Sequence, residues 1–182
     1  MLSSRSATAS ASESPRADDG LRCGLVAVMR QGVRVGVDVG SVRVGVAASD
    51  PGGMLASPVT VLRRQARQGT DLDEIVLLVA ERAAIEVVVG LPRSLRDHEG
   101  AAAQSARDYA RALARRVAPV PVRLVDERLS TVQAQRGMQA AGRSVRASRA
   151  RIDAAAAVVV LQSALDTERT AGAPPGELMA DA

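Results

Sequence analysis

The chain has 182 residues and a formal net charge of +4, and 47% of its residues are hydrophobic but only 1% aromatic. This length favours one domain with a core of Val, Leu, Ile and Ala, and the scarcity of aromatic side chains excludes the base-stacking platforms of many single-strand binders. The single cysteine, Cys23, excludes a disulfide framework, and no apolar run approaches the roughly 20 residues that span a bilayer. We expect a cytoplasmic protein without a membrane partner.

Both ends of the chain have compositions typical of disordered tails. Residues 1–30 are rich in Ser, Ala and Arg and show no hydrophobic period, and residues 167–182 have a similar character. A single folded domain is therefore predicted over residues 31–166.

The first part of this domain predicts three strands in succession. Valines alternate over residues 33–39, and a tight turn at Gly40 and Ser41 leads into a second strand over residues 43–48. Residues 54–62 predict a third strand, which Pro58 places at a sheet edge or bends. Together they form an antiparallel meander.

Helices and buried strands alternate after the meander. Helical spacing is seen over residues 70–83 and 106–117, short apolar runs over 85–89 and 120–125 indicate buried strands, a capping box at Ser130 opens a short helix, and residues 152–165 form a last helix. Because crossover connections are right-handed, both later strands should run parallel to the first. The predicted fold class is α/β: a mixed five-stranded sheet, with a three-stranded antiparallel meander plus two parallel strands, and helices on both faces.

The positive charge of the predicted domain is concentrated in one segment. Residues 31–166 contain 19 Arg against 14 Asp and Glu, a net charge of +5, and residues 136–151 alone account for this excess. The arginines of that segment are Arg136, Arg143, Arg146, Arg149 and Arg151. The segment is either a solvated loop or an arm that contacts phosphates. An arm that neutralises about five phosphates would give a log–log salt slope of roughly −3.5 to −4.5.

Acidic residues stand at the ends of the predicted core elements. Asp38 lies in a strand between Gly36 and Gly40, where a carboxylate is costly to bury unless it binds a cation or several donors. A turn-capping role is the alternative. Asp126 and Glu127 follow a buried strand, at the sheet end where ligands gather in α/β proteins. Because side chains alternate along a strand, only one of the two should face the site; we favour Glu127, with Asp126 as the alternative.

Asp153 lies in the first turn of the last predicted helix, where the helix dipole stabilises a carboxylate. It is either an ordinary N-terminal helix acid or a third member of the acidic site. Three converging carboxylates repel and raise one another's pKa, and a divalent cation relieves that conflict. Oxygen ligands suit Mg²⁺ or Mn²⁺, and two such ions can activate water and stabilise a leaving oxygen. The sequence offers no His or Cys cluster for zinc.

Four blocks of sequence, in this order, resemble the YqgF/RuvX family of the ribonuclease H-like, RuvC-related superfamily. They are GVDVGSVRVGVA at residues 36–47 with Ser49 and Asp50, VGLP at 89–92, DERLST at 126–131, and IDAAAA at 152–157 followed by Leu161 and Gln162. The resemblance implies an acidic metal site of Asp38, Glu127 and Asp153, with Asp126 left open. It also implies a nuclease that matures the 5′ end of pre-16S ribosomal RNA, in a family earlier proposed to resolve Holliday junctions.

Three functions are therefore weighed. The first is a metal-dependent endonuclease acting on structured RNA, the pre-16S rRNA, in pre-ribosomal particles. The second is a resolvase of branched, four-way DNA, and the third is a non-catalytic RNA-binding assembly factor. Arg43, beside Gly45, is either a ligand of the scissile phosphate or a surface strand residue. Whether the protein is a monomer or a homodimer is left open by the sequence.

Overall fold

The computed structural model describes residues 29–65, 67–92, 100–126 and 149–179, with side chains from Ala154 onward in the last segment. The predicted N-terminal tail up to residue 28 and the short helix expected near Ser130 lie outside the described residues. No helix in the described part of the chain has the length and apolarity needed to cross a bilayer.

The predicted meander is present. Strands β1 (Arg34–Val39), β2 (Arg43–Ser49) and β3 (Ala56–Arg63) pair antiparallel in succession. The backbone N–H of Gly40 donates to the carbonyl of Arg43 at 2.9 Å and closes the first turn. Pro58 lies beside a register shift in β3, which is an edge strand. Proline has no N–H to donate to a ladder, and edges and bulges are the places in a sheet that tolerate it.

The remaining elements complete a mixed sheet. They are α1 (Thr70–Glu81), β4 (Glu86–Leu91), α2 (Ala101–Val117), β5 (Val122–Asp126), α4 (Arg149–Ala171) and β6 (Glu177–Leu178). β4 pairs parallel with β1, and β5 pairs parallel with β4, as the crossover rule predicts. The strand order is β3-β2-β1-β4-β5-β6. The predicted α/β fold class is thus confirmed.

The sheet has six strands where the sequence predicted five. β6 pairs antiparallel with β5, and the N–H of Met179 donates to the carbonyl of Val122 at 2.8 Å. The segment expected to be a tail from residue 167 therefore continues α4 to Ala171 and then adds this strand. The sequence pattern missed the continuation of α4 because Glu168 is a charged residue that is buried through its ion pairs, not as part of an apolar period.

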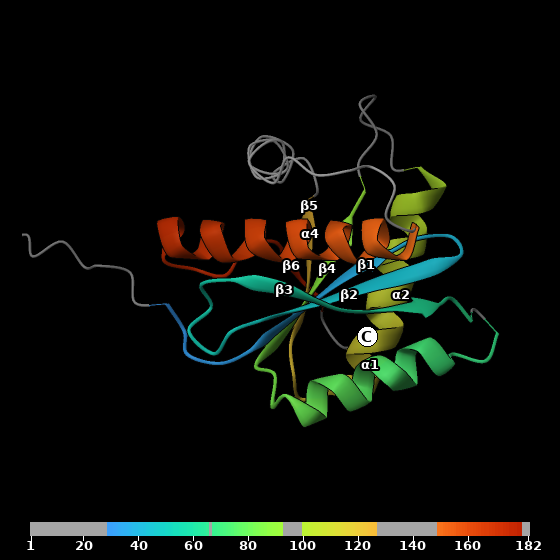
Figure 1. The fold of residues 1–182 in the computed structure, drawn as a ribbon, viewed down its shortest axis with the longest axis horizontal. Coiled ribbons are helices and arrows are strands. Elements are labelled where there is room, and N and C mark those ends of the chain that lie inside the picture. Colours follow the sequence, from blue (N-terminus) through green and yellow to red (C-terminus); the bar gives the residue numbers. More distant parts are fainter. Residues whose placement is uncertain (1–28, 66, 93–99, 127–148, 180–182) are drawn as a thin grey trace, which may run out of the picture.

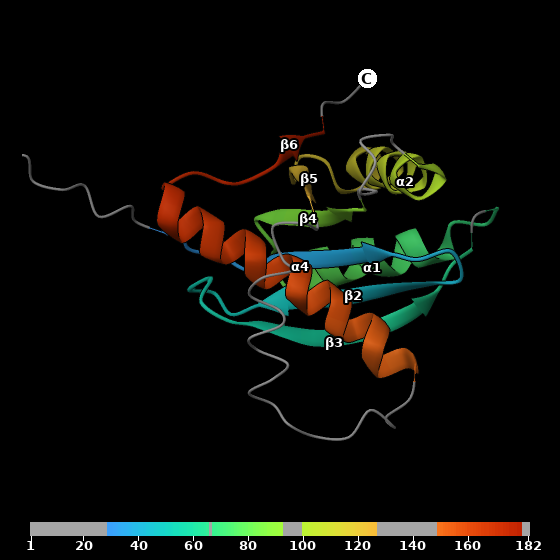
Figure 2. The same cartoon turned by 90° about the horizontal axis from the view of Figure 1, so that it is seen from above.

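Helices cover both faces of the sheet (Figures 1 and 2). α4 lies across one face, and α1 and α2 pack on the other. In β1, Val35 and Val37 belong to the core under α1 and α2, whereas Gly36 contacts α4. Side chains alternate along a strand, so Asp38 lies on the α4 face with Gly36.

The start of α1 has a glycine N-cap and a buried carboxylate. Gly69 is the N-cap, in the left-handed region at φ 68°, and no side chain caps the helix. Asp71 is buried instead and accepts a hydrogen bond from the hydroxyl of Tyr109 at 3.1 Å. This carboxylate therefore ties α1 to α2 rather than opening the helix.

Candidate active site

Asp38 is surrounded by glycines on its face of the sheet. It is half-buried, and its partner across the β1–β2 ladder is Gly45. On the other side β1 pairs with β4 up to Val37 and Val89, so the next residue of β4 beside Asp38 is Gly90. Neither neighbour has a side chain. This carboxylate therefore has no neighbouring side chain from either adjacent strand, and it lies at the carboxyl end of a parallel strand, where α/β proteins bind ligands.

α4 packs closely on the face of β1 that carries Asp38. A Cβ added to Gly36 would lie 2.6 Å from Cβ of Leu161 and 3.1 Å from the carbonyl oxygen of Ala157, so only glycine permits this approach. Glu168 pairs with Arg34, while Leu161 lies on Gly36. Moving along β1 from Arg34 to Gly36 therefore corresponds to moving back along α4 from Glu168 to Leu161. The start of α4 thus lies toward the end of β1 that carries Asp38.

Asp153 lies in the first part of α4, four residues or about one turn before Ala157. The direction of α4 brings this turn toward the end of β1 that carries Asp38. The side chain of Asp153 lies outside the described residues. The backbone thus brings the two predicted acidic positions to one end and one face of the sheet.

Asp126 is the last residue of β5 and pairs with Leu91 of β4. Val122 and Leu124 belong to the core under α1 and α2, whereas Val125 belongs to the core under α4. Alternation therefore assigns Asp126 to the face opposite Asp38, if the strand stays regular to its end. The next residue, Glu127, lies outside the described residues.

Of the predicted phosphate-binding arginines, Arg43 is the one whose side chain the structure describes. Arg43 is half-buried at the start of β2, next to the glycine-lined region. Asp38, Arg43 and Asp126 each have at least one polar or electrostatic partner. Arg149 and Arg151 lie in the first turn of α4, with side chains outside the described residues, and Arg136, Arg143 and Arg146 lie wholly outside them.

Other residues of the family-like pattern hold the fold. The carboxylate of Asp50 accepts N–H bonds from Leu55 and Met54 at 2.7 Å and from Gly52 at 2.9 Å, and these bonds lower its pKa. Gln162 accepts the N–H of Ala56 at 2.9 Å and so joins α4 to β3. These side chains close the β2–β3 turn at the end of the sheet away from Asp38.

A buried ionic network that the sequence reasoning missed occupies that same far end. Glu86 accepts from Arg30 at 2.7 Å and from Arg123 at 2.8 Å, and Glu168 accepts from Arg30 at 2.7 Å and from Arg34 at 3.0 Å. Burial would raise the pKa of Glu168, but Arg30 and Arg34 outweigh it and hold that pKa below its ordinary value. The available signal in the sequence was a charged residue, Arg34 or Glu86, at the start of each of two otherwise apolar strands.

A metal site needs more than the described side chains. The described residues alone contain no group of three His, Cys, Asp or Glu side chains that could hold an ion. Asp38 supplies one carboxylate at the glycine-lined position, and the other two predicted carboxylates belong to Glu127 and to the Asp153 side chain. An all-oxygen donor set of this kind suits a hard cation such as Mg²⁺ or Mn²⁺.

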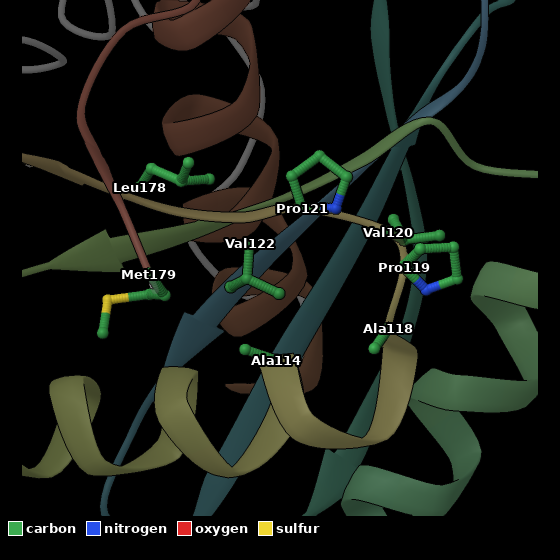
Figure 3. A pocket seen from close by; sticks show the side chains of 8 residues that line it. All are labelled: Ala114, Ala118, Pro119, Val120, Pro121, Val122, Leu178 and Met179. Carbon is green, nitrogen blue, oxygen red and sulfur yellow. The ribbon is translucent and has the colours of Figure 1, made fainter. Parts of the chain in front are cut away.

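One cavity lies between the end of α2 and the start of β5 (Figure 3). The side chains that line it are apolar and belong to Ala114, Ala118, Pro119, Val120, Pro121, Val122, Leu178 and Met179. No lining side chain titrates or could ligate a hard cation. This cavity therefore has no part in the acidic site.

Comparisons with known proteins show the family of this chain. The RuvX family model, described as Holliday junction resolvase, matches residues 32–167. A curated protein of Frankia casuarinae, "Putative pre-16S rRNA nuclease", is 59% identical over 142 residues, which are 78% of this chain and 70% of that protein. A relative of the same name from Thermobifida fusca is 56% identical over 158 residues and covers 83% of this chain and 98% of its own.

Among solved structures, T. thermophilus RuvC in complex with a Holliday junction substrate has a similar fold. It superposes with a TM-score of 0.57 and 18% sequence identity, covering 79% of this chain and 99% of that one. At this identity the similarity concerns the fold alone, and it agrees with the ribonuclease H-like sheet expected from the sequence.

Proposed function

Since the chain belongs to the RuvX family, we propose that it is a metal-dependent endonuclease of the cytoplasm that processes the 5′ end of pre-16S rRNA. The relatives named for that activity are more than half identical to this chain over most of its length. The observation that carries the proposal is Asp38, a half-buried carboxylate between glycines at the carboxyl end of a parallel strand.

We assign the acidic site to Asp38, Glu127 and Asp153. Alternation in β5 puts Asp126 on the face of α1 and α2, so the next residue, Glu127, is the better candidate for the α4 face. Glycine at position 36 lets α4 approach β1 closely, which supports a role for Asp153 one turn before Ala157.

The residues of this site suit a cleavage reaction at a phosphodiester. A bound Mg²⁺ or Mn²⁺ would supply an activated water and stabilise the leaving oxygen. In this proposal the carboxylate of Asp38 marks the position of the reacting centre on the sheet, and its neighbours Gly45 and Gly90 add no side chain that would obstruct a phosphate. Arg43, at the same end of the sheet, is suited to hold a phosphate of the bound strand through its guanidinium.

The arginines of residues 136–151 are proposed to bind further phosphates of the RNA. The last two arginines of that segment, Arg149 and Arg151, lie in the first turn of α4 and are close to Asp153 in the sequence. Its charge attracts a polyanion regardless of sequence, so it supplies affinity and not the choice of cleavage site.

Cleavage of a pre-16S rRNA fragment by the purified protein with Mg²⁺ or Mn²⁺ tests the proposal. Asp38→Asn should reduce the cleavage rate by more than about 100-fold, because even outer partners of a metal site cost 10–100-fold. Glu127→Gln should have a comparable effect. Asp126→Asn is the matched control and should retain most of the activity, since its carboxylate belongs to the other face.

Two results would contradict the assignment. Equal cleavage by wild type and Asp38→Asn would remove the acidic site from the reaction. Loss of activity in Asp126→Asn with retention in Glu127→Gln would assign Asp126, and not Glu127, to the acidic site.

Resolution of four-way DNA is a second candidate, favoured by the description of the matching family. The same variants, incubated with a four-way junction, should then lose paired symmetric nicking. If the wild type cleaves neither substrate but binds RNA through its arginines, the non-catalytic alternative is correct.

A further inference from the structure

Two arginines stand directly opposite each other at the active-site end of the sheet. Arg43 of β2 and Arg63 of β3 are register partners in the antiparallel ladder. Cβ atoms of such a pair lie about 5 Å apart, and like charges in this arrangement destabilise a sheet. An anion bound between the two guanidinium groups would lie within reach of both charges.

Both arginines belong to the face of the sheet that carries Asp38. The next pair along the ladder is Val44 and Leu62, and both are buried in the core under α1 and α2. Alternation therefore directs Arg43 and Arg63 to the α4 face. Asp38 pairs with Gly45, two residues from Arg43, so its carboxylate and the arginine pair occupy neighbouring rows of one face.

Arg63 is exposed and makes no ion pair or hydrogen bond with the side chains that the structure describes. The next residue behaves differently. Arg64 donates to the carbonyl of Gly40 at 3.0 Å and lies over the ring of Tyr109, 5.3 Å from its centroid. Of two consecutive arginines, one therefore secures the β1–β2 turn and the other extends from the sheet edge into solvent.

We propose that Arg63, together with Arg43, binds a backbone phosphate of a nucleic-acid strand that crosses β3 and β2 toward Asp38. The inference rests on the proposed nuclease function and adds the path of the substrate over the β3 edge. Neighbouring strands are about 4.8 Å apart, so Arg63 lies two strands or about 10 Å from β1. It is therefore a positioning residue that holds a phosphate next to the scissile one, and the planar guanidinium suits that contact.

Binding measurements in the absence of divalent metal test this path separately from cleavage. Arg63→Ser is compared with Arg82→Ser, which removes the same charge from an exposed arginine after α1, at the other end of the sheet. The affinities for a structured RNA and for a four-way DNA junction are measured across a series of salt concentrations. The two ligands share the phosphodiester backbone, and the comparison shows which of them uses this contact.

Arg63→Ser should weaken binding about five- to eightfold at 0.1 M salt and reduce the log–log salt slope by about 0.7–0.9, the value of one phosphate contact. Arg82→Ser should leave both near wild type. In the cleavage assay Arg63→Ser should raise KM and leave kcat unchanged, as expected for a contact made equally in ground and transition states.

Equal salt slopes for the two variants would overturn the inference, and so would a wild type that binds neither nucleic acid. A wild type that binds with the Arg63 contribution but cleaves nothing would refute the proposed nuclease while leaving this phosphate contact intact. The two failures are therefore distinguishable.

Discussion

The two ends of β1 use charge in opposite ways on the same face of one strand. At its start, the side chain of Arg34 is buried and pairs with Glu168, within the network that Arg30, Glu86 and Arg123 complete. Near its end, Asp38 is half-buried and its sheet neighbours on that face are glycines. One end gathers buried charges into ion pairs, and the other places a half-buried carboxylate among glycines.

This difference separates stability from chemistry along a single strand. A buried charge is tolerated only when paired, and the network satisfies that condition with five side chains from four elements and the segment before β1. The glycines beside Asp38 contribute no side-chain packing, yet a bound cation and phosphate would benefit from the lack of side chains there. We therefore expect substitutions in the network to change stability and substitutions around Asp38 to change activity.

Removal of Glu86 should have the largest effect on stability. Glu86 is almost fully buried and accepts from both Arg30 and Arg123. Glu86→Ala should lower the free energy of unfolding by about 3 kcal/mol, the lower end of the range for breaking a buried pair, because Arg30 and Arg123 reach solvent. Urea denaturation at pH 7 measures the loss, and the cleavage rate per folded molecule should stay near that of wild type.

Glu177 provides the matched control for that experiment. Its carboxylate pairs with Arg107 at 2.7 Å, but 57% of its side chain is exposed. Glu177→Ala should cost at most about 1 kcal/mol, as is usual for surface ion pairs. Equal losses in the two variants would contradict a special structural role for the buried network.

Gly36 lies between the two ends, and a side chain there should disturb both. The added Cβ of Gly36→Ala would lie 2.6 Å from Leu161, so α4 must move away from the sheet. We expect a loss of about 1–3 kcal/mol in the free energy of unfolding, the usual cost of overpacking. The shift of α4 should also displace Asp153 and lower the cleavage rate, unlike Glu86→Ala.

Gly100 gives the control for this substitution, since a Cβ there would meet nothing within 4 Å. Gly100→Ala should change stability by no more than about 1 kcal/mol, because the loss of a favourable N-cap opposes the gain from a less flexible unfolded chain. A Gly36→Ala protein with wild-type stability and activity would show that close packing of α4 is not required.

Sequence reasoning recovered the parts of this molecule that depend on local period. The valine alternation of β1, the edge position of Pro58 and the parallel β4 and β5 follow from side-chain alternation and crossover handedness, and the structure has them all. Asp38 could be chosen because glycines flank it in a strand, which is a local signal as well.

Features that depend on contacts between distant residues were not predictable in this way. Glu168 pairs with Arg30 and Arg34 across more than 130 positions of the chain, and no pattern near residue 168 signals that partnership. β6 was missed because two residues added to an existing edge leave no period of their own. The buried contact between Asp71 and the hydroxyl of Tyr109 was missed because the two residues lie on different helices.

The pH dependence of stability gives a smaller test of the same division between the two ends. Arg30 and Arg34 hold the pKa of Glu168 below its ordinary value in the folded protein, against the opposing effect of burial. In the unfolded chain this carboxyl titrates near its reference value of about 4.3. A carboxyl with a depressed folded pKa contributes stability that is fully present above the unfolded pKa and is lost as the pH falls through the folded pKa.

Wild type should therefore lose stability progressively below about pH 4.3, and Glu168→Gln should be less stable at pH 7 but show a shallower decline on acidification. Urea denaturation at a series of pH values between 7 and 3 measures both curves. Parallel declines would mean that Glu168 is not held ionised by its arginines, and the contrast between the two ends of β1 would then rest on Asp38 alone.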